Sequence, residues 1–336
     1  MIKWCIIGAG GIADRRTIPA ILSDPTNKIV ALMEKNEEVG TAVSLKYGIK
    51  CYNDEEEMLK NEDCDCVYIA TPVFCHYPQA MIALKYGKHV FIEKPIALNA
   101  EDGKKMLDAF KKAGKHLFIG YMMKYHNLHV KAKNIVKDGG IGDAVDARLQ
   151  FCCWYPDIAG AWRQKKSLGG GGAFMDLGVH CIELVEYVLG DEITELKGFY
   201  NTKTFSYEVE DSAVMTFKTK NGVLGHIDVN FNIPDKASVS KMEIYGTKGY
   251  IICSGTLAQE EVGTLSYLYS PQGDYDSAQS RTETKPRRFK GKNGNLYLKQ
   301  INDFCKQINS GRINYRYAEK AVHVQELVDS FYKENK

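Results

Sequence analysis

Three side chains in this sequence have types and spacings suited to proton transfer. Lys94 lies in the run Glu93-Lys94-Pro95, where the chain leaves a short apolar segment. Asp176 and His180 stand four positions apart in a helical pattern, so both would lie on one face, one turn apart. The unperturbed pKa of histidine suits a general base, and a lysine cation lowers the pKa of a bound hydroxyl. The set predicts a site that takes a proton from an alcohol and stabilises alkoxide charge.

Each of these residues also has a structural interpretation when it is taken alone. His180 could be a core histidine on a helix, and Lys94 could be an ordinary surface lysine. Asp176 could complement the dipole of the helix whose first turn it occupies. The catalytic interpretation therefore depends on the three residues acting as one set.

A glycine-rich turn at the start of the chain predicts a dinucleotide site. The first apolar run is followed by Gly8-Ala9-Gly10-Gly11-Ile12-Ala13, which opens a helical pattern. Gly8 permits a tight turn, Gly10 lets the backbone approach a pyrophosphate, and Ala13 lets the helix pack on the strand. The amides of the helix N-terminus would then face the phosphates. The alternative is a tight turn with a structural role only.

Glu34 ends the second apolar run and indicates which dinucleotide is bound. An acidic residue about 20 residues beyond the glycines binds the ribose hydroxyls. A carboxylate at this position disfavours a 2′-phosphate, whereas Lys35, the next residue, could hold one. The pair predicts NAD as the cofactor, with NADP left open.

Buried strands alternate with helices over residues 1–122, which predicts a parallel sheet. The predicted strands are Lys3–Ile7, Ile29–Met33, Cys66–Ala70, His89–Ile92 and His116–Gly120. The predicted helices are Ile12–Leu22, Val39–Tyr47, Glu55–Lys60, Tyr77–Tyr86 and Ala100–Ala113. Asn99 is a predicted N-cap, Asp102 completes a capping box, and Gly114 ends the last helix.

Residues 123–336 have a different pattern, in which consecutive strands predict a second domain of α+β class. The predicted strands are Asp143–Trp154, Glu195–Tyr200, Asp211–Thr219, Gly222–Asn230, Lys241–Gly246 and Tyr250–Ser254, the later ones as an antiparallel meander. The predicted helices are Leu128–Lys137, Phe174–Leu189, Leu296–Ser310 and Tyr317–Glu334. We expect the polar stretch Gln259–Asn293 to be a long surface excursion, and its basic cluster Lys285–Lys292 to be a solvated loop.

Composition limits the remaining possibilities. A chain of 336 residues, 44% hydrophobic and 26% charged, is long enough for two globular domains. The net charge of +2 gives no electrostatic reason to expect a nucleic acid or an anionic membrane as partner. The apolar runs are shorter than the ~18 residues of a membrane helix, and the N-terminus lacks a signal-peptide pattern. The ten cysteines lack metal-site spacing, so we expect reduced thiols, no metal and a cytoplasmic protein.

Three further motifs, in this order after the glycine turn, identify a family resemblance. They are Ala70-Thr71-Pro72 with His76, then Glu93-Lys94-Pro95, then the run Gly172–His180 with its D-x-G-x-H pattern from Asp176. With them the chain resembles, over essentially its whole length, the glucose–fructose oxidoreductase/inositol dehydrogenase/rhizopine-catabolism (Gfo/Idh/MocA) family.

The resemblance implies an α/β Rossmann domain plus an α+β domain with an open-faced, mostly antiparallel sheet. In this family the free face of that sheet commonly makes the oligomer, which implies a homodimer or homotetramer. It also implies that Lys94 touches the substrate hydroxyl and the cofactor, that Asp176 and His180 face it, and that the Lys94-Pro95 bond is often cis.

The expected activity is NAD(P)-dependent hydride transfer at a secondary hydroxyl of a sugar, glycoside or inositol, with His180 as acid and base. Two alternatives stay open: a glycosidase that uses NAD for transient oxidation, and a non-catalytic regulator that senses the dinucleotide. Expected cofactor ligands are Gly8, Gly10, Gly11, Ile12, Ala13, Glu34, Lys35, Thr71, Pro72, His76, Glu93, Lys94, Trp162 and Arg163. Expected substrate ligands are Lys94, Tyr121, Lys124, Tyr155, Arg163, Asp176 and His180.

Overall fold

The chain packs as two compact units. The structure, a computed structural model, describes residues 1–275, 277–278 and 284–335. The N-terminal unit comprises residues 1–121, 160–170 and 297–329. The sheet unit comprises residues 122–159, 171–296 and 330–336.

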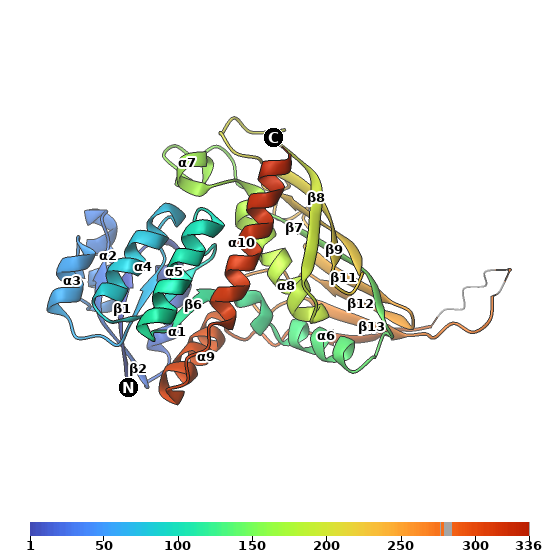
Figure 1. Ribbon diagram of the computed structural model, residues 1–336, viewed down its shortest axis with the longest axis horizontal. Coiled ribbons are helices and arrows are strands. Elements are labelled where there is room, and N and C mark those ends of the chain that lie inside the picture. The colour runs from blue at the N-terminus through green and yellow to red at the C-terminus, as the bar shows by residue number, and fades with distance from the viewer. Residues whose placement is uncertain (276, 279–283, 336) are drawn as a thin grey trace. The chain divides into compact units, whose positions relative to one another are not determined.

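The N-terminal unit contains a six-stranded parallel sheet in the order β3-β2-β1-β4-β5-β6. Its strands β1, β2 and β6 are labelled in Figure 1. Its strands are β1 (Ile2–Ile7), β2 (Asn27–Met33), β3 (Cys51–Tyr52), β4 (Cys66–Ile69), β5 (His89–Glu93) and β6 (Leu117–Gly120). Its first helices are α1 (Ile18–Leu22), α2 (Glu37–Tyr47), α3 (Glu55–Asn61), α4 (His76–Lys85) and α5 (Ala100–Ala113). The predicted Rossmann architecture is confirmed. The strand order reverses its direction at β1, and open α/β sheets bind their ligands at such a point.

Aromatic side chains form much of the core of this unit. Trp4 of β1, Phe91 of β5 and Phe118 of β6 all surround Phe304. Their ring centroids lie 5.4, 5.5 and 5.5 Å from that of Phe304. Phe304 belongs to α9 (Leu296–Ser310), so a helix from the end of the chain closes the core of the first sheet.

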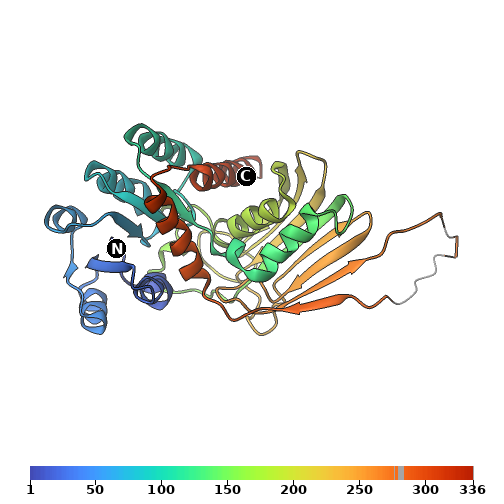
Figure 2. The ribbon, with the colours of Figure 1, turned by 90° about the horizontal axis from the view of Figure 1, so that it is seen from below.

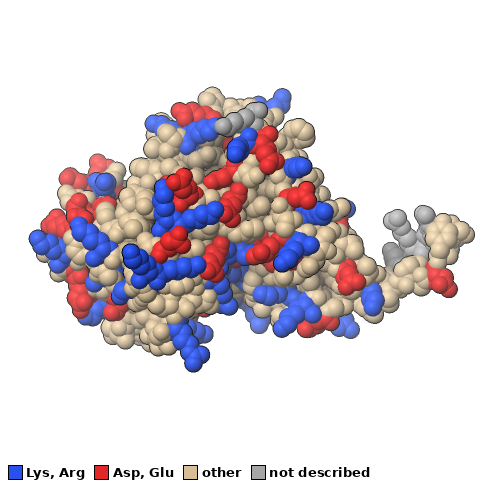
Figure 3. All heavy atoms as spheres, viewed as in Figure 1, with Lys and Arg blue, Asp and Glu red and all other residues tan. Residues whose placement is uncertain are grey.

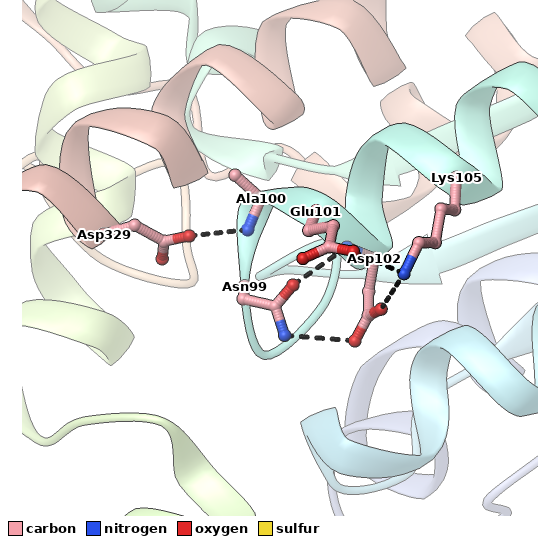
Figure 4. A network of polar contacts seen from close by, with 6 residues as sticks. All are labelled: Asn99, Ala100, Glu101, Asp102, Lys105 and Asp329. Carbon is pink, nitrogen blue, oxygen red and sulfur yellow. Dashed lines mark hydrogen bonds and ion pairs between the residues drawn. The ribbon is translucent and has the colours of Figure 1, made fainter.

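The start of α5 is held by two side chains (Figure 4). Asn99 Oδ1 accepts a hydrogen bond from the Asp102 amide at 2.8 Å, which confirms the predicted N-cap. In a capping box the Asp102 carboxylate would accept from the backbone amide of Asn99. Here it accepts from the side-chain amide of Asn99 at 3.0 Å, so the second bond of the capping box joins two side chains. Asp329 of α10 (Arg316–Glu334) accepts from the Ala100 amide at 2.7 Å. At the other end Gly114 has a φ of 61°, as expected of a C-terminal glycine.

The sheet unit contains an eight-stranded sheet in the order β14-β13-β12-β11-β7-β10-β9-β8. Its strands are β7 (Ala144–Cys152), β8 (Ile193–Asn201), β9 (Ser212–Thr219), β10 (Leu224–Asn230), β11 (Lys241–Gly246), β12 (Gly249–Ser254), β13 (Thr264–Tyr269) and β14 (Arg287–Lys290). Helices α6 (Asn127–Lys137) and α8 (Val179–Leu189) lie side by side over one face of it (Figure 2). The opposite face is called the outer face below.

Three expectations for this unit need correction. A simple antiparallel meander is wrong, because β7 lies between β10 and β11 and pairs with β10 in parallel. The stretch Gln259–Asn293 is not only a surface excursion, because it contains β13 and β14; residues 276 and 279–283 lie outside the described residues. Four residues of the basic cluster Lys285–Lys292 form β14, the edge strand, where exposed charges discourage pairing with another chain.

Two predicted helices begin with a π-helical segment. Residues Ala13–Thr17 precede α1, and residues Phe174–Gly178, here η5, precede α8. A π turn has a wider repeat than an α turn, and such segments are frequent at functional sites. Asp176 lies inside η5. The four positions between Asp176 and His180 therefore correspond only approximately to one α-helical turn.

Acidic and basic side chains are interspersed on the face of the molecule shown in Figure 3, in keeping with the small net charge. None of the described helices is both long and apolar enough to cross a membrane. All ten cysteines are free thiols, as expected.

Candidate active site

The glycine turn is shaped by close contact with a neighbouring strand end. Gly8 has a φ of +83°, and a Cβ built on it would lie 2.8 Å from the methyl carbon of Thr71. A Cβ on Gly10 would lie 2.9 Å from Val39 Cγ1. On Gly11, in contrast, a Cβ would meet nothing within 4 Å among the described residues beyond its own chain neighbourhood. The turn is therefore closed on the protein side and open at Gly11, which leaves room for a phosphate to approach the backbone.

Glu34 lies against this turn. Its Oε2 accepts a hydrogen bond from the Gly10 amide at 3.2 Å, and its Oε1 accepts from the Asn36 amide at 3.1 Å. Lys35 is exposed. Burial raises the pKa of the Cys75 thiol, and the positive charge of Lys35 acts against this rise. A glycine cradle with a carboxylate at the end of β2 fits a dinucleotide whose ribose binds at Glu34.

Thr71 and Pro72 follow β4, and two side chains of α4 hold Thr71. The hydroxyl of Thr71 donates to Gln79 Oε1 at 2.6 Å. His76 is buried, with Nε2 3.0 Å from the Thr71 carbonyl oxygen and Nδ1 2.8 Å from the Pro95 carbonyl oxygen. Burial lowers the pKa of His76 to about 4, and the nearby charges of Lys94 and Arg163 act in the same direction. His76 is therefore neutral at neutral pH, and both ring nitrogens face protein carbonyls.

Lys94 follows directly after β5. The Lys94-Pro95 peptide bond is cis, as the resemblance implied. The preceding residue, Glu93, accepts a hydrogen bond from the hydroxyl of Tyr68 at 2.6 Å, and Tyr68 in turn accepts from Thr17 at 2.9 Å. Burial raises the pKa of Glu93, while Tyr68 and the charges of Lys94 and Arg163 act against this rise.

Trp162 and Arg163 form a 3-10 turn, residues Trp162–Gln164, within the N-terminal unit. The Arg163 guanidinium lies 4.3 Å from the centre of the Trp162 ring, a cation–π contact. Because its charge acts on both His76 and Glu93, Arg163 lies near the same strand ends as Lys94. The N-terminal unit thus gathers two cations near the carboxyl ends of β4 and β5.

Asp176 and His180 lie in the sheet unit. Asp176 is partly buried in η5, and His180 is buried at the start of α8. The His180 ring meets the edge of Phe151 from β7 with centroids 6.3 Å apart. Lys94 belongs to the N-terminal unit, whereas Asp176 and His180 belong to the sheet unit.

A buried carboxylate that the motifs do not include anchors η5. Glu210 accepts from the amides of Gly172 and Phe174 at 3.0 and 2.9 Å and from the Tyr332 hydroxyl at 2.7 Å. A Cβ on Gly172 would lie 1.9 Å from the Glu210 carbonyl oxygen, which explains a glycine there. Glu210 ends a polar segment, Thr202–Glu210, in which its carboxylate resembles any surface acid, so no sequence signal identified it.

The predicted substrate ligands have the following surroundings. Lys124 is buried, with Nζ 3.1 Å from a carboxylate oxygen of Glu183 on α8, three residues after His180. The partly buried Tyr155 packs its ring on Phe231 at 5.0 Å. Tyr121 is buried at the end of the first segment of the N-terminal unit. Among the described residues, no group of three or more His, Cys, Asp and Glu side chains is arranged to hold a metal ion.

Comparison with known families gives two matches that together cover most of the chain. Residues 2–121 match an oxidoreductase family with an NAD-binding Rossmann fold. Residues 129–252 match the GFO/IDH/MocA C-terminal domain.

Individual relatives match over most of their length. A 1,5-anhydro-D-fructose reductase from Ensifer adhaerens is 30% identical over 276 residues, 82% of each chain. A myo-inositol 2-dehydrogenase from Thermotoga maritima is 27% identical over 290 residues, 84% of this chain and 81% of the relative. The crystal structure of aldose-aldose oxidoreductase from Caulobacter crescentus complexed with glycerol has a TM-score of 0.86 at 22% identity, covering 99% of this chain and 96% of that one. At that identity the structural likeness concerns the fold alone.

Proposed function

Because this chain belongs to the GFO/IDH/MocA family of NAD(P)-binding oxidoreductases, we propose that it moves a hydride between the nicotinamide and a secondary hydroxyl of a sugar, glycoside or inositol. One observation carries the proposal. Lys94 leaves the same edge of the parallel sheet as the glycine turn after β1 and Glu34 after β2. The carboxyl ends of parallel strands are where open α/β sheets bind cofactor and substrate.

The chemistry divides between the cofactor and three side chains. When bound, the dinucleotide supplies the hydride acceptor or donor. The Lys94 ammonium binds the substrate oxygen and stabilises the charge that develops on it. His180 takes the hydroxyl proton during oxidation and returns it during reduction. Asp176 binds the substrate and assists His180 in the proton transfer.

The substrate class follows from two features. The named activities of the relatives, a 1,5-anhydro-D-fructose reductase and a myo-inositol 2-dehydrogenase, both concern small polyhydroxylated molecules. The predicted substrate ligands Tyr121, Lys124, Tyr155 and Arg163 combine aromatic rings with cations, which suits hydroxyl-rich rings better than an apolar ligand. We propose a ring polyol or its ketone as substrate, NAD as the preferred cofactor, and assembly through the outer face of the sheet unit.

The first test measures NADH formation with a panel of pyranoses, glycosides and inositols. We expect net NADH formation with a ring polyol. Lys94→Ala and His180→Ala should each lower kcat by about 10²-fold or more, because each removes a group that acts on the transferred proton. NADH binding should survive, and the double variant should be little worse than either single variant, since the residues act as a unit.

Lys85→Ala is the control, because Lys85 lies on the surface of α4 in an exposed ion pair with Glu56. Cleavage of a glycoside that needs NAD but forms no net NADH would instead indicate the glycosidase. Tight NADH binding with no turnover of any panel member would indicate the regulator. Near-normal kcat in His180→Ala would show that another residue is the base.

A further inference from the structure

His76 lies between two turns that carry site residues of the N-terminal unit. It is the first residue of α4 and is 1% exposed. One ring nitrogen is 2.8 Å from the carbonyl oxygen of Pro95, the residue after Lys94. The other is 3.0 Å from the carbonyl oxygen of Thr71. The ring thus joins the ends of β4 and β5 on the edge where the ligands are expected.

The contacts continue from Thr71 to the glycine turn. A Cβ on Gly8 would lie 2.8 Å from Thr71 Cγ2 and 2.9 Å from its amide nitrogen, so the two turns touch. Gln79, one turn further along α4, fixes the Thr71 hydroxyl at 2.6 Å. A continuous series of contacts therefore runs from the glycine turn through Thr71 and His76 to the residue beside Lys94.

The chemistry of the ring explains why a histidine suits this place. Imidazole presents nitrogens on two edges of one rigid ring, and here each nitrogen lies near a carbonyl oxygen that follows a different strand. Burial keeps the ring neutral at neutral pH, and neutral imidazole carries one N–H. One N–H can donate to only one of the two carbonyls. On Nδ1 it donates to the Pro95 carbonyl, so this bond ties the Lys94 turn to the start of α4, and Nε2 then contacts the Thr71 carbonyl without a hydrogen bond.

We propose that His76 is a positioning residue that holds the Lys94 turn in register with the cofactor-binding turn. It acts through Lys94 and Thr71 and does not itself meet the reacting atoms. The proposal rests on the proposed function in so far as Lys94 acts on the substrate. The displacement of a catalytic group by about 1 Å can cost about 10²-fold in rate, so the loss of such a link affects kcat before it affects binding.

Three variants and one control test the proposal. His76→Ala removes both contacts. His76→Asn can place an amide N–H near the position of Nδ1, toward Pro95, whereas His76→Gln reaches toward the position of Nε2 and Thr71. His89→Ala is the matched control: His89 begins the same strand β5 at its opposite end, its Nδ1 accepts the His116 amide at 3.0 Å, and burial lowers its pKa to about 4 as well.

Five quantities are measured for each variant: melting temperature, Kd for NADH, kcat and KM for the sugar substrate, and hydrogen exchange of a peptide covering residues 94–98. We expect His76→Ala to lose about 10- to 100-fold in kcat with Kd for NADH changed less than about threefold. His76→Asn should recover most of kcat, and His76→Gln less. Exchange at residues 94–98 should accelerate in His76→Ala and stay unchanged in His89→Ala.

The proposal is overturned if His76→Ala keeps wild-type kcat, or if its loss merely follows melting temperature as in His89→Ala. It is also overturned if His76→Asn is no better than His76→Ala. If the alanine variant folds poorly, the Asn and Gln variants decide by their difference in kcat. Should the wild type oxidise no panel sugar, the proposed function fails, while the exchange experiment still decides whether His76 holds the Lys94 turn.

Discussion

Glu34 is held by two backbone amides at the place where a ribose is expected. Its carboxylate accepts from Gly10 and Asn36, which fixes the side chain before a ligand binds. A hydrogen bond from a ribose hydroxyl to this carboxylate is charge-assisted, and a 2′-phosphate there would be repelled. We expect Glu34→Ala to weaken NADH binding by about 10- to 100-fold, because such bonds contribute about 1.5–3 kcal/mol, and to weaken NADPH binding less or improve it.

Titration calorimetry with both cofactors measures this, with Glu37→Ala as control, since Glu37 is exposed in the first turn of α2. An equal loss for NADH and NADPH would remove Glu34 as the ribose ligand.

The motifs locate Glu34 and Lys94 because their positions at strand ends follow from chain order. They do not locate Tyr68 or Gln79, whose roles come from cross-strand and loop neighbours that only the folded chain brings together.

At the scale of elements, η5 and α8 carry Asp176 and His180, and Glu210 fixes their start. Burial raises the pKa of Glu210, so the folded state resists its ionisation. This group therefore stabilises the fold most at pH values below its unfolded pKa. The contribution declines as pH rises through the raised folded pKa. Glu210→Gln stays neutral, so we expect its destabilisation relative to wild type to shrink as pH rises from 4 to 7.

Urea unfolding at several pH values measures this, with Glu208→Gln as the exposed neighbouring control. Glu210→Ala should lower the free energy of unfolding by about 2–4 kcal/mol, because it leaves buried amides without their acceptor. A destabilisation of Glu210→Gln that grows with pH would mean that the ionised form is the stabilising one.

The elements that periodicity predicts correctly are those whose pattern is local. Strand β4 is a continuous apolar run, β1 is apolar except for Lys3, and α5 carries both its caps in the sequence. β14 escaped prediction because Arg287, Arg288 and Lys290 are charged, and only pairing with β13 makes them a strand. The parallel pairing of β7 with β10 likewise depends on contacts between distant segments, which no local pattern contains.

At the scale of the whole molecule, chain order does not define the compact units. Residues 297–329 were expected within a domain that extends to the C-terminus, yet they pack with residues 1–121, where Phe304 meets Trp4 and Phe91. Helical periodicity predicts that these helices exist but not which sheet they cover, because an apolar face can pack on either.

The outer face of the sheet unit exposes apolar side chains in register. Phe199 of β8 and Val214 of β9 are directly paired and are 81% and 49% exposed. An apolar pair exposed on a sheet face favours burial against a second copy of the chain.

We expect light scattering to report a dimer or tetramer for the wild type. The double variant Phe199→Glu with Val214→Glu should be a monomer, because two charges would be buried unpaired at the interface. Leu45→Glu, at a 79% exposed position on α2, should leave the assembly intact. A wild-type monomer at micromolar concentration would refute assembly, and an intact oligomer of the double variant would place the interface on another surface.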